Sequence, residues 1–235
     1  MENKISGDAN IAAVAVLMSE PPRAAMLAAL ADGRALPAGE LAYRAQVTAQ
    51  TASTHLSRLV EGGLLVVEAH GRHRYYKLAH RQVAEALEAL AVLAPPRRVR
   101  SLRESLEAER LRFARTCYDH LAGSLGVQLT QRLGEMQILT ITEQTYEVTP
   151  EGMTFLGHLG VNVKQIQRQP RAFTRRCLDW SERRYHLAGG VGAALAQRLF
   201  ELEWIQRMPK NRAVLVTEYG REELLKHFGL TICMS

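Results

Sequence analysis

The chain has 235 residues, of which 47% are apolar and 23% charged, as in ordinary globular proteins, and its length suits one small domain plus a second of similar or larger size. No apolar run approaches about 18 residues, and no cationic segment precedes an apolar core at the start, so we expect neither a membrane span nor a secretory signal. The three scattered cysteines, Cys117, Cys177 and Cys233, predict no disulfide framework and fit a reducing cytoplasm.

The formal net charge of +6 favours a polyanionic partner, but its distribution does not locate the binding site. Residues 1–95 carry nine basic and nine acidic side chains, and the whole excess lies in residues 96–235. A nucleic-acid site therefore has to be found from a motif rather than from bulk charge.

The first 96 residues predict a succession of helices interrupted by one β-hairpin. Pro21 and Pro22 separate the first two helices, Thr48 can cap the fourth, Gly62 ends it, and Gly71 marks the hairpin turn. The predicted elements are helices over 11–19, 23–31, 37–45 and 48–61, a hairpin over 64–78 and a helix over 82–93. This order is that of a winged helix-turn-helix.

In such a motif the second helix of the pair enters the DNA major groove, and residues near its N-terminus meet base edges. Glutamine pairs with adenine, arginine pairs with guanine or phosphate, and a basic hairpin can follow the backbone or a narrow minor groove. Leu56, Leu59 and Val60 lie on the opposite, core-facing side by helical spacing. The predicted DNA contacts are Gln50, Thr51, Ser53, Thr54, His55 and Arg58 on the helix, and Arg72 and Arg74 on the hairpin.

Two segments of this region resemble the ArsR/SmtB family of winged-helix repressors. Residues 51–64 are similar to the family's recognition-helix segment, and residues 71–78 to its wing. The resemblance covers residues 11–93 and implies a homodimer joined through the segments 11–18 and 83–93. It also implies repression that is relieved when an effector binds.

The chain departs from that family at both of its known metal sites. Residues 38–45 lack the paired cysteines of the arsenic and cadmium sensors, and the last helix of the domain has only His80, at its start, in place of the zinc sensors' ligands. We therefore expect effector sensing in the second half of the chain.

The second half contains an internal repeat with offsets of 66 to 69 residues. The matching segments are 120–133 with 186–199, 148–152 with 216–220, and 158–161 with 227–230. Each copy predicts a helix, a short strand pair and a helix, and two copies predict a compact pseudo-twofold pair rather than a solenoid.

These observations predict a mainly α fold with small β-hairpins (α+β), an N-terminal winged helix-turn-helix and a C-terminal domain of two pseudo-repeats. A basic, helix-favouring stretch around Arg97, Arg98, Arg100 and Arg103 continues to residue 115. The predicted domains are a DNA-binding and dimerisation domain (1–96), a basic helical linker (97–112) and a duplicated effector-sensing domain (113–235, with repeats of about 113–165 and 173–235).

Thiol, imidazole and carboxylate side chains precede the two glycine-rich stretches of this domain, and such groups bind zinc-like transition metals. On continuous helices, Cys117 could share an ion with His120, and Glu182 with His186, whereas Cys177 and His186 would lie on opposite faces. A mixed site requires the pseudo-twofold axis to bring both segments together. The candidate effector or metal residues are Cys117, Asp119, His120, Cys177, Asp179, Glu182 and His186.

Other interpretations of this half remain open. An organic ligand could bind near Tyr118, Trp180 and Tyr185, or the half could be purely structural or dimerising. The stretch Gly189-Gly-Val-Gly192 lacks the strand and lysine of a nucleotide loop. Together with Gly123 and Gly126, it predicts two helices that cross closely.

The sequence as a whole predicts a cytoplasmic, sequence-specific DNA-binding transcription regulator that is not an enzyme. We expect a homodimeric repressor on an inverted-repeat operator in double-stranded DNA, released by a metal or small-molecule effector of the C-terminal domain. The alternatives are a metal-dependent enzyme and a protein-interaction adaptor. No G-x-S-x-G or H-E-x-x-H motif supports the first, and Arg58, Arg72 and Arg74 favour DNA over the second.

Overall fold

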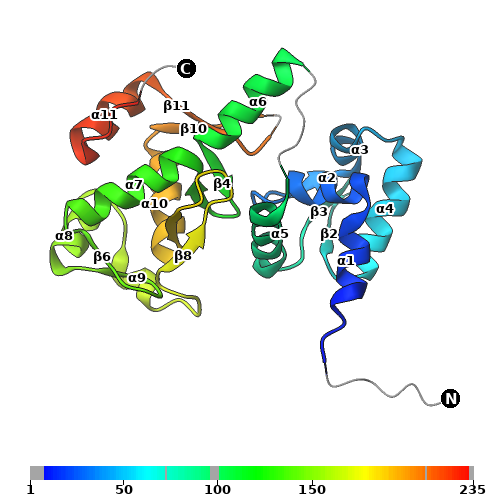
Figure 1. Cartoon of the computed structure of the whole chain (residues 1–235), viewed down its shortest axis with the longest axis horizontal. Helices are drawn as coiled ribbons and strands as arrows, with labels where there is room; N and C mark the ends of the chain where they lie inside the picture. Colours follow the sequence, from blue (N-terminus) through cyan, green and yellow to red (C-terminus); the bar gives the residue numbers. More distant parts are fainter. Residues whose placement is uncertain (1–7, 72, 96–100, 210, 233–235) are drawn as a thin grey trace. The chain divides into compact units, whose positions relative to one another are not determined.

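A computed structural model describes residues 8–71, 73–95, 101–209 and 211–232. The chain separates into two compact units, residues 1–87 and residues 88–235, and the boundary falls inside helix α5 (Figure 1). Predictions made for Arg72, Arg97, Arg98, Arg100 and Cys233 lie outside the described residues.

The first unit has the predicted winged-helix order, with one additional short strand. The elements are α1 (Ile11–Ser19), α2 (Pro21–Ala29), β1 (Leu36–Pro37), α3 (Ala38–Ala45), α4 (Ala49–Glu61), β2 (Leu65–His70), β3 (His73–Leu78) and α5 (Arg81–Leu93). The strands form one antiparallel sheet in the order β1-β3-β2. Helix α2 begins at Pro21, two residues before the predicted start, because proline is tolerated in a first turn, where its missing N–H has no helical partner.

The turn between α3 and α4 depends on two local features. Gln46 ends α3 in the left-handed region with a φ of 56°, and its N–H bonds back to the carbonyl of Tyr43. Thr48 then caps α4, because its Oγ1 accepts a hydrogen bond from the backbone N–H of Thr51 at 3.2 Å. These two caps set the point at which α4 leaves the turn.

The second unit contains the two predicted pseudo-repeats, which confirms the expected fold class. Its elements are α6 (Leu102–Phe113), β4 (Arg115–Cys117), β5 (His120–Ala122), α7 (Gly123–Glu135), β6 (Leu139–Ile141), β7 (Tyr146–Val148), α8 (Pro150–His158), α9 (Val163–Gln167), β8 (Arg175–Leu178), β9 (Tyr185–Ala188), α10 (Gly189–Glu201), β10 (Ile205–Arg207), β11 (Val214–Val216) and α11 (Glu218–Phe228). Each repeat therefore consists of a hairpin, a helix, a second hairpin and a second helix.

The prediction that each repeat begins with a helix through its cysteine and histidine is wrong. These segments are the hairpins β4–β5 and β8–β9, and α6 ends at Phe113 instead of continuing through residue 115. Strands of three or four residues are too short to show a periodicity that distinguishes them from helix. In the first hairpin, Tyr118 makes the tight turn in the left-handed region, with a φ of 58°.

The two repeats are interlocked. Helix α7 packs on strand β9 of the other repeat, and α10 packs on β5. The hydroxyl of Thr130 on α7 accepts a hydrogen bond of 2.8 Å from the backbone N–H of Leu187 on β9. A Cβ on Gly126 would lie 2.6 Å from the carbonyl oxygen of Leu121, so this glycine lets α7 fold back on its own preceding strand. This contact is a steric reason for glycine at position 126 that the sequence analysis did not anticipate.

In the part of the chain that is described, no single helix is both long and apolar enough to cross a membrane. Helices α1 and α2 reach the required length and composition only as a pair, and a bend of 92° separates them.

Candidate nucleic-acid interface and candidate metal centre

Helix α4 has one buried and one exposed face. Leu56 and Leu59 are completely buried in the core of the first unit, together with Ala52, and Val60 is partly buried, as helical spacing predicted. The predicted DNA contacts of this helix are placed by the structure as follows: Gln50, Thr51, Ser53, Thr54 and Arg58 are exposed, and His55 is half-buried. The helix therefore presents hydroxyl, amide and guanidinium groups to solvent, beginning at its N-terminus.

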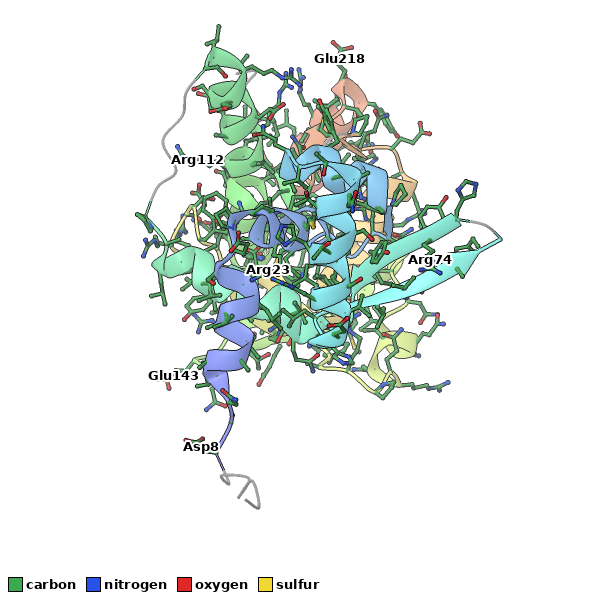
Figure 2. All side chains as sticks on the ribbon, turned by 90° about the vertical axis from the view of Figure 1, so that its right-hand side faces the viewer. Asp8, Arg23, Arg74, Arg112, Glu143 and Glu218 are labelled. Atoms are coloured by element: carbon green, nitrogen blue, oxygen red, sulfur yellow. The ribbon has the colours of Figure 1, made fainter. Side chains whose placement is uncertain are left out.

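The hairpin β2–β3 is a regular antiparallel ribbon with six cross-strand pairs, from Leu65 with Leu78 to His70 with His73. Strand β2 ends at His70 and β3 begins at His73, so the tip of the hairpin lies between these two residues. Arg74 is exposed beside that tip, opposite Ala69 (Figure 2). The first unit thus combines a polar helix face with a basic hairpin.

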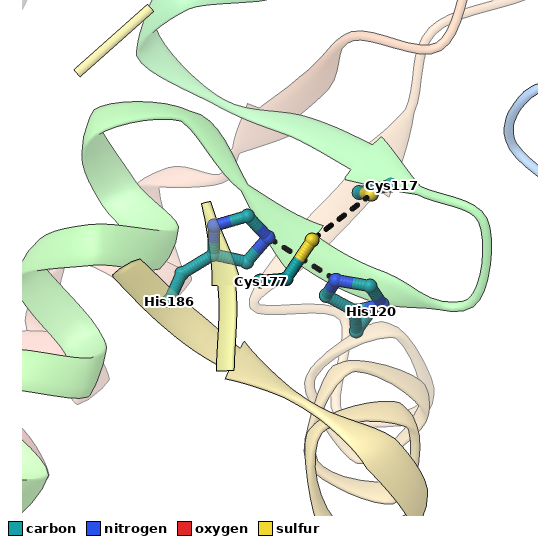
Figure 3. A group of neighbouring side chains, drawn as sticks. All are labelled: Cys117, His120, Cys177 and His186. Atoms are coloured by element: carbon teal, nitrogen blue, oxygen red, sulfur yellow. Dashed lines mark hydrogen bonds between the residues drawn. The ribbon is translucent and has the colours of Figure 1, made fainter. Parts of the chain in front are cut away.

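A second group of functional side chains lies in the interior of the second unit. Cys117 and His120 are a cross-strand pair on β4–β5, and Cys177 and His186 are a cross-strand pair on β8–β9. The four ligand atoms all lie within 4.8 Å of one another (Figure 3). The two Sγ atoms are 3.9 Å apart and the two histidine Nε2 atoms 3.1 Å apart. Four side chains that could hold a metal ion therefore converge from two hairpins.

This arrangement corrects the prediction that Cys177 and His186 could not share an ion. The prediction assumed a continuous helix, on which residues nine apart point in opposite directions. In a hairpin the same residues face each other across two strands, because the intervening loop folds back. The structure brings together the cysteine and histidine side chains of both repeats, which was the condition for a mixed site.

The three predicted carboxylates lie outside this group of four. Asp119 lies behind His120, with Oδ1 3.3 Å from the ring Nδ1, and pairs with Arg171 at 2.9 Å. Asp179 lies behind His186, with Oδ2 3.8 Å from Nδ1. Glu182 is in the loop, where its backbone N–H donates to Asp179 Oδ1 at 3.0 Å. Asp119 is therefore within hydrogen-bond distance of a histidine, whereas Asp179 lies near the other histidine without bonding to it, and Glu182 bonds to Asp179 through its backbone.

Arg115 is a buried charged residue next to this site that the sequence analysis did not nominate. Its side chain is fully buried and donates to Asp179 Oδ2 at 2.8 Å and to Ser181 Oγ at 3.1 Å. Its guanidinium also stacks over the ring of Trp180, 4.5 Å from the centroid. The pattern Arg-x-Cys at 115–117 and again at 175–177 was the available signal, since it recurs in both repeats.

The charges around the four side chains are unevenly distributed. A hydrogen bond with Cys177 and burial raise the pKa of Cys117 to about 12, whereas the same bond lowers the pKa of Cys177. Burial opposes protonation of His120, but Cys117 and the Asp119 carboxylate outweigh it and raise the pKa to about 9. Burial lowers the pKa of His186. Burial by itself would raise the pKa of Asp179. The positive charge of Arg115 and several hydrogen bonds to the carboxylate outweigh burial and hold this pKa far below its usual range.

The alternative organic-ligand site has less structural support. A cavity in the second unit lies between α7 and α10 and is lined mainly by leucines and glycines, among them Leu121, Gly126 and Gly192. Tyr118, Trp180 and Tyr185 do not line this cavity.

Comparisons with known proteins agree with this geometry. The sequence pattern of a helix-turn-helix domain family matches residues 18–68, which contain both α3 and α4. The HTH-type transcriptional regulator YdfF of Bacillus subtilis (strain 168) is 50% identical over 223 residues, which are 95% of this chain and 99% of YdfF. The chain is thus a DNA-binding transcriptional regulator with a winged helix-turn-helix, in which α4 is the second helix of the motif and the hairpin β2–β3 is the wing. The chain belongs to the family of HTH-type transcriptional regulators that includes YdfF.

Two solved structures resemble part of the chain. HlyU from Vibrio cholerae N16961 is 27% identical and covers 40% of this chain and 97% of its own, with a TM-score of 0.34. The cadmium metal-sensor CMTR from Mycobacterium tuberculosis is 35% identical and covers 39% of this chain and 96% of its own, with a TM-score of 0.31. Because these scores are low, the family assignment rests on YdfF and on the matched domain.

Proposed function

We propose that the protein is a cytoplasmic, homodimeric repressor of the ArsR type, which binds an inverted-repeat operator and is released by an effector bound in the second unit. The observation that carries this proposal is the division of α4 into a buried face and an exposed polar face. A helix with this division, preceded by α3 and followed by a hairpin, docks in the major groove in helix-turn-helix proteins.

Within this proposal the side chains of the first unit have different tasks. Gln50, Thr51, Ser53 and Thr54 lie in the first two turns of α4 and would meet base edges, where amide and hydroxyl groups read hydrogen-bond patterns. Arg58, farther along, would reach guanine or phosphate. Arg74 on the hairpin would contact the DNA backbone. Because residues 1–95 have no net charge, specific affinity would depend on these placed groups.

Dimerisation is supported by apolar side chains that a single chain leaves exposed. On α1, Ile11 and Val16 are 75% and 64% exposed, and on α5, Leu90 and Leu93 are 50% and 82% exposed. A second copy of the chain would bury such side chains and would present two recognition helices about 34–36 Å apart, one turn of DNA.

The cysteine and histidine residues of each unit indicate which unit binds the effector. The first unit has none of the cysteines that metal sensors of the ArsR type carry on α3. The second unit concentrates buried thiol and imidazole groups in one place. We therefore assign the effector site to the second unit.

The test measures DNA binding by the full-length protein with fluorescence anisotropy. The DNA is the region upstream of the protein's own gene and duplexes selected from random sequence. Arg58→Ala and Arg74→Ala should each weaken binding about five- to 150-fold, the cost of losing one good DNA contact. Arg103→Ala on α6 is the matched control, because it removes the same charge from a well-exposed side chain outside the first unit. Its affinity should stay unchanged.

Two results would contradict the proposal. One is the absence of any sequence-preferring binding at low salt, and the other is an equal loss of affinity in all three variants. The repressor role is tested separately with a reporter gene downstream of the selected operator, where the protein should lower transcription. An increase in transcription would instead identify an activator.

A further inference from the structure

We propose that Cys117, His120, Cys177 and His186 bind one zinc-class transition-metal ion in a tetrahedral site, and that this ion links the two repeats of the second unit. This inference goes beyond the proposed repressor function. It concerns the chemistry of the second unit, whatever effect the protein has on transcription.

The sulfur–sulfur and nitrogen–nitrogen distances are close to those around a tetrahedral ion, and all four ligand atoms lie within 4.8 Å of one another. The edge of a tetrahedron is about 1.6 times the distance from its centre to a corner, so zinc–sulfur bonds of about 2.3 Å place two sulfurs about 3.8 Å apart. Zinc–nitrogen bonds of about 2.0–2.1 Å place two nitrogens about 3.3–3.4 Å apart. The observed separations are 3.9 Å between the sulfurs and 3.1 Å between the nitrogens. The sulfurs are also too far apart for a disulfide, whose length is about 2.05 Å.

Each histidine has a carboxylate near its outer nitrogen, and for His120 the carboxylate is within hydrogen-bond distance. His120 Nδ1 lies 3.3 Å from Asp119, and His186 Nδ1 lies 3.8 Å from Asp179. Metal-binding histidines commonly donate their second ring N–H to such a carboxylate, which fixes the tautomer and leaves the other nitrogen free for the metal. Here the free nitrogens would be the two Nε2 atoms, which point toward each other (Figure 3).

Burial and ligand type narrow the ion to the zinc class. The residues Cys117, His120 and His186 are 3% exposed or less, and Cys177 is 9% exposed. Two thiolates with two imidazoles select zinc and similar thiophilic ions over magnesium or calcium, which prefer oxygen. Four protein ligands also fill all four positions, which is typical of a structural or sensing site and leaves no place for a substrate.

The site joins the repeats because each contributes one cysteine and one histidine. The packing of the helices has the same exchanged pattern: a Cβ on Gly126 of α7 would lie 3.9 Å from the Cβ of His186, and one on Gly192 of α10 would lie 3.5 Å from the Cβ of His120. Each helix therefore passes within van der Waals distance of a histidine of the other repeat. The interlocked packing therefore positions the ligands before any ion binds.

The test uses full-length protein, stripped with a chelator under reducing conditions and then titrated with Co²⁺ and Zn²⁺. We expect one Co²⁺ per chain, with the visible bands of tetrahedral cobalt and thiolate-to-cobalt charge transfer, and stoichiometric displacement by Zn²⁺. Cys117→Ser and His186→Gln should weaken binding at least 100-fold. Asp119→Asn, behind a ligand, should weaken it about 10- to 100-fold.

His158→Gln is the matched control, because this histidine is exposed at the end of α8 and should leave the spectrum unchanged. The spectrum of the unmodified protein is informative even if a ligand variant fails to fold. Binding of less than one ion per chain, an octahedral spectrum without charge transfer, or an unchanged spectrum after Cys117→Ser would overturn the inference. DNA affinity is measured on the same samples. Failure of metal binding with intact DNA binding rejects this inference alone, and the reverse result rejects the proposed function alone.

Discussion

Asp179→Ala should be among the most damaging single changes in the second unit, because this carboxylate supports both the buried arginine and the interlocking of the repeats. Asp179 Oδ2 accepts from the guanidinium of Arg115 at 2.8 Å and from the backbone N–H of Gly123 at 2.7 Å. Its Oδ1 accepts from Ser181 N–H at 2.9 Å. Arg115 and Gly123 belong to the first repeat, so the contacts hold one repeat to the other.

The magnitude follows from the burial of the ion pair. Both side chains of the Arg115–Asp179 pair are fully buried, and removing one partner of such a pair costs about 3–5 kcal/mol because a charge is left without compensation. The nearest other carboxylate is Glu88, whose Oε2 lies 3.9 Å from the same guanidinium nitrogen. It would recover part of this loss, so we expect the lower end of the range.

Urea unfolding followed by tryptophan fluorescence measures this loss in the correct part of the molecule. Trp180 and Trp204 are the chain's two tryptophans, and both belong to the second unit. A loss of about 3 kcal/mol lowers the midpoint by about 1–3 M at the m-values usual for urea. All samples contain a chelator, so that loss of a bound metal does not contribute to the difference.

Glu135→Ala is the matched control, because Glu135 pairs with Arg132 on an exposed face of α7 and should leave the midpoint unchanged. A shift for Asp179→Ala no larger than that of the control would refute the reasoning. Asp179→Asn keeps an oxygen acceptor and removes the charge. If it is as stable as the parent, the hydrogen bonds rather than the charge hold Arg115.

Two further predictions concern the packing of α8 and the association of chains. Gly152→Ala should lower the free energy of unfolding by about 1–3 kcal/mol in the same urea assay, because the added Cβ would overlap the carbonyl of Ile138. The control is Gly157→Ala in the same helix, whose Cβ would meet nothing within 4 Å and which should be neutral or stabilising. Equal effects of the two changes would contradict this packing. Leu93→Glu on α5 should shift sedimentation from dimer toward monomer, because Leu93 is an exposed leucine of the proposed interface. Leu215→Glu, at another exposed leucine, is the control and should leave sedimentation unchanged. A Leu93→Glu protein that remains fully dimeric would argue against the α5 interface.

Much of the first unit could be predicted from the sequence, because its signals are local. The cap at Thr48, the core spacing of Leu56 and Leu59 and the turn at Gly71 each depend on residues only a few positions apart. Strand β1 could not be predicted, since two residues have no periodicity and pair only because β3 passes beside them.

In the second unit the sequence determined the duplication and nominated all four cysteine and histidine residues, because similar segments are visible without any structure and both pairs precede or begin them. It did not determine that these segments are hairpins, since three- and four-residue strands have no distinctive period. Only the tertiary structure decided that Cys117, His120, Cys177 and His186 meet. Their meeting depends on the packing of each repeat's helix against the other repeat's strand, across 60 or more residues of chain, and no local pattern specifies such a contact.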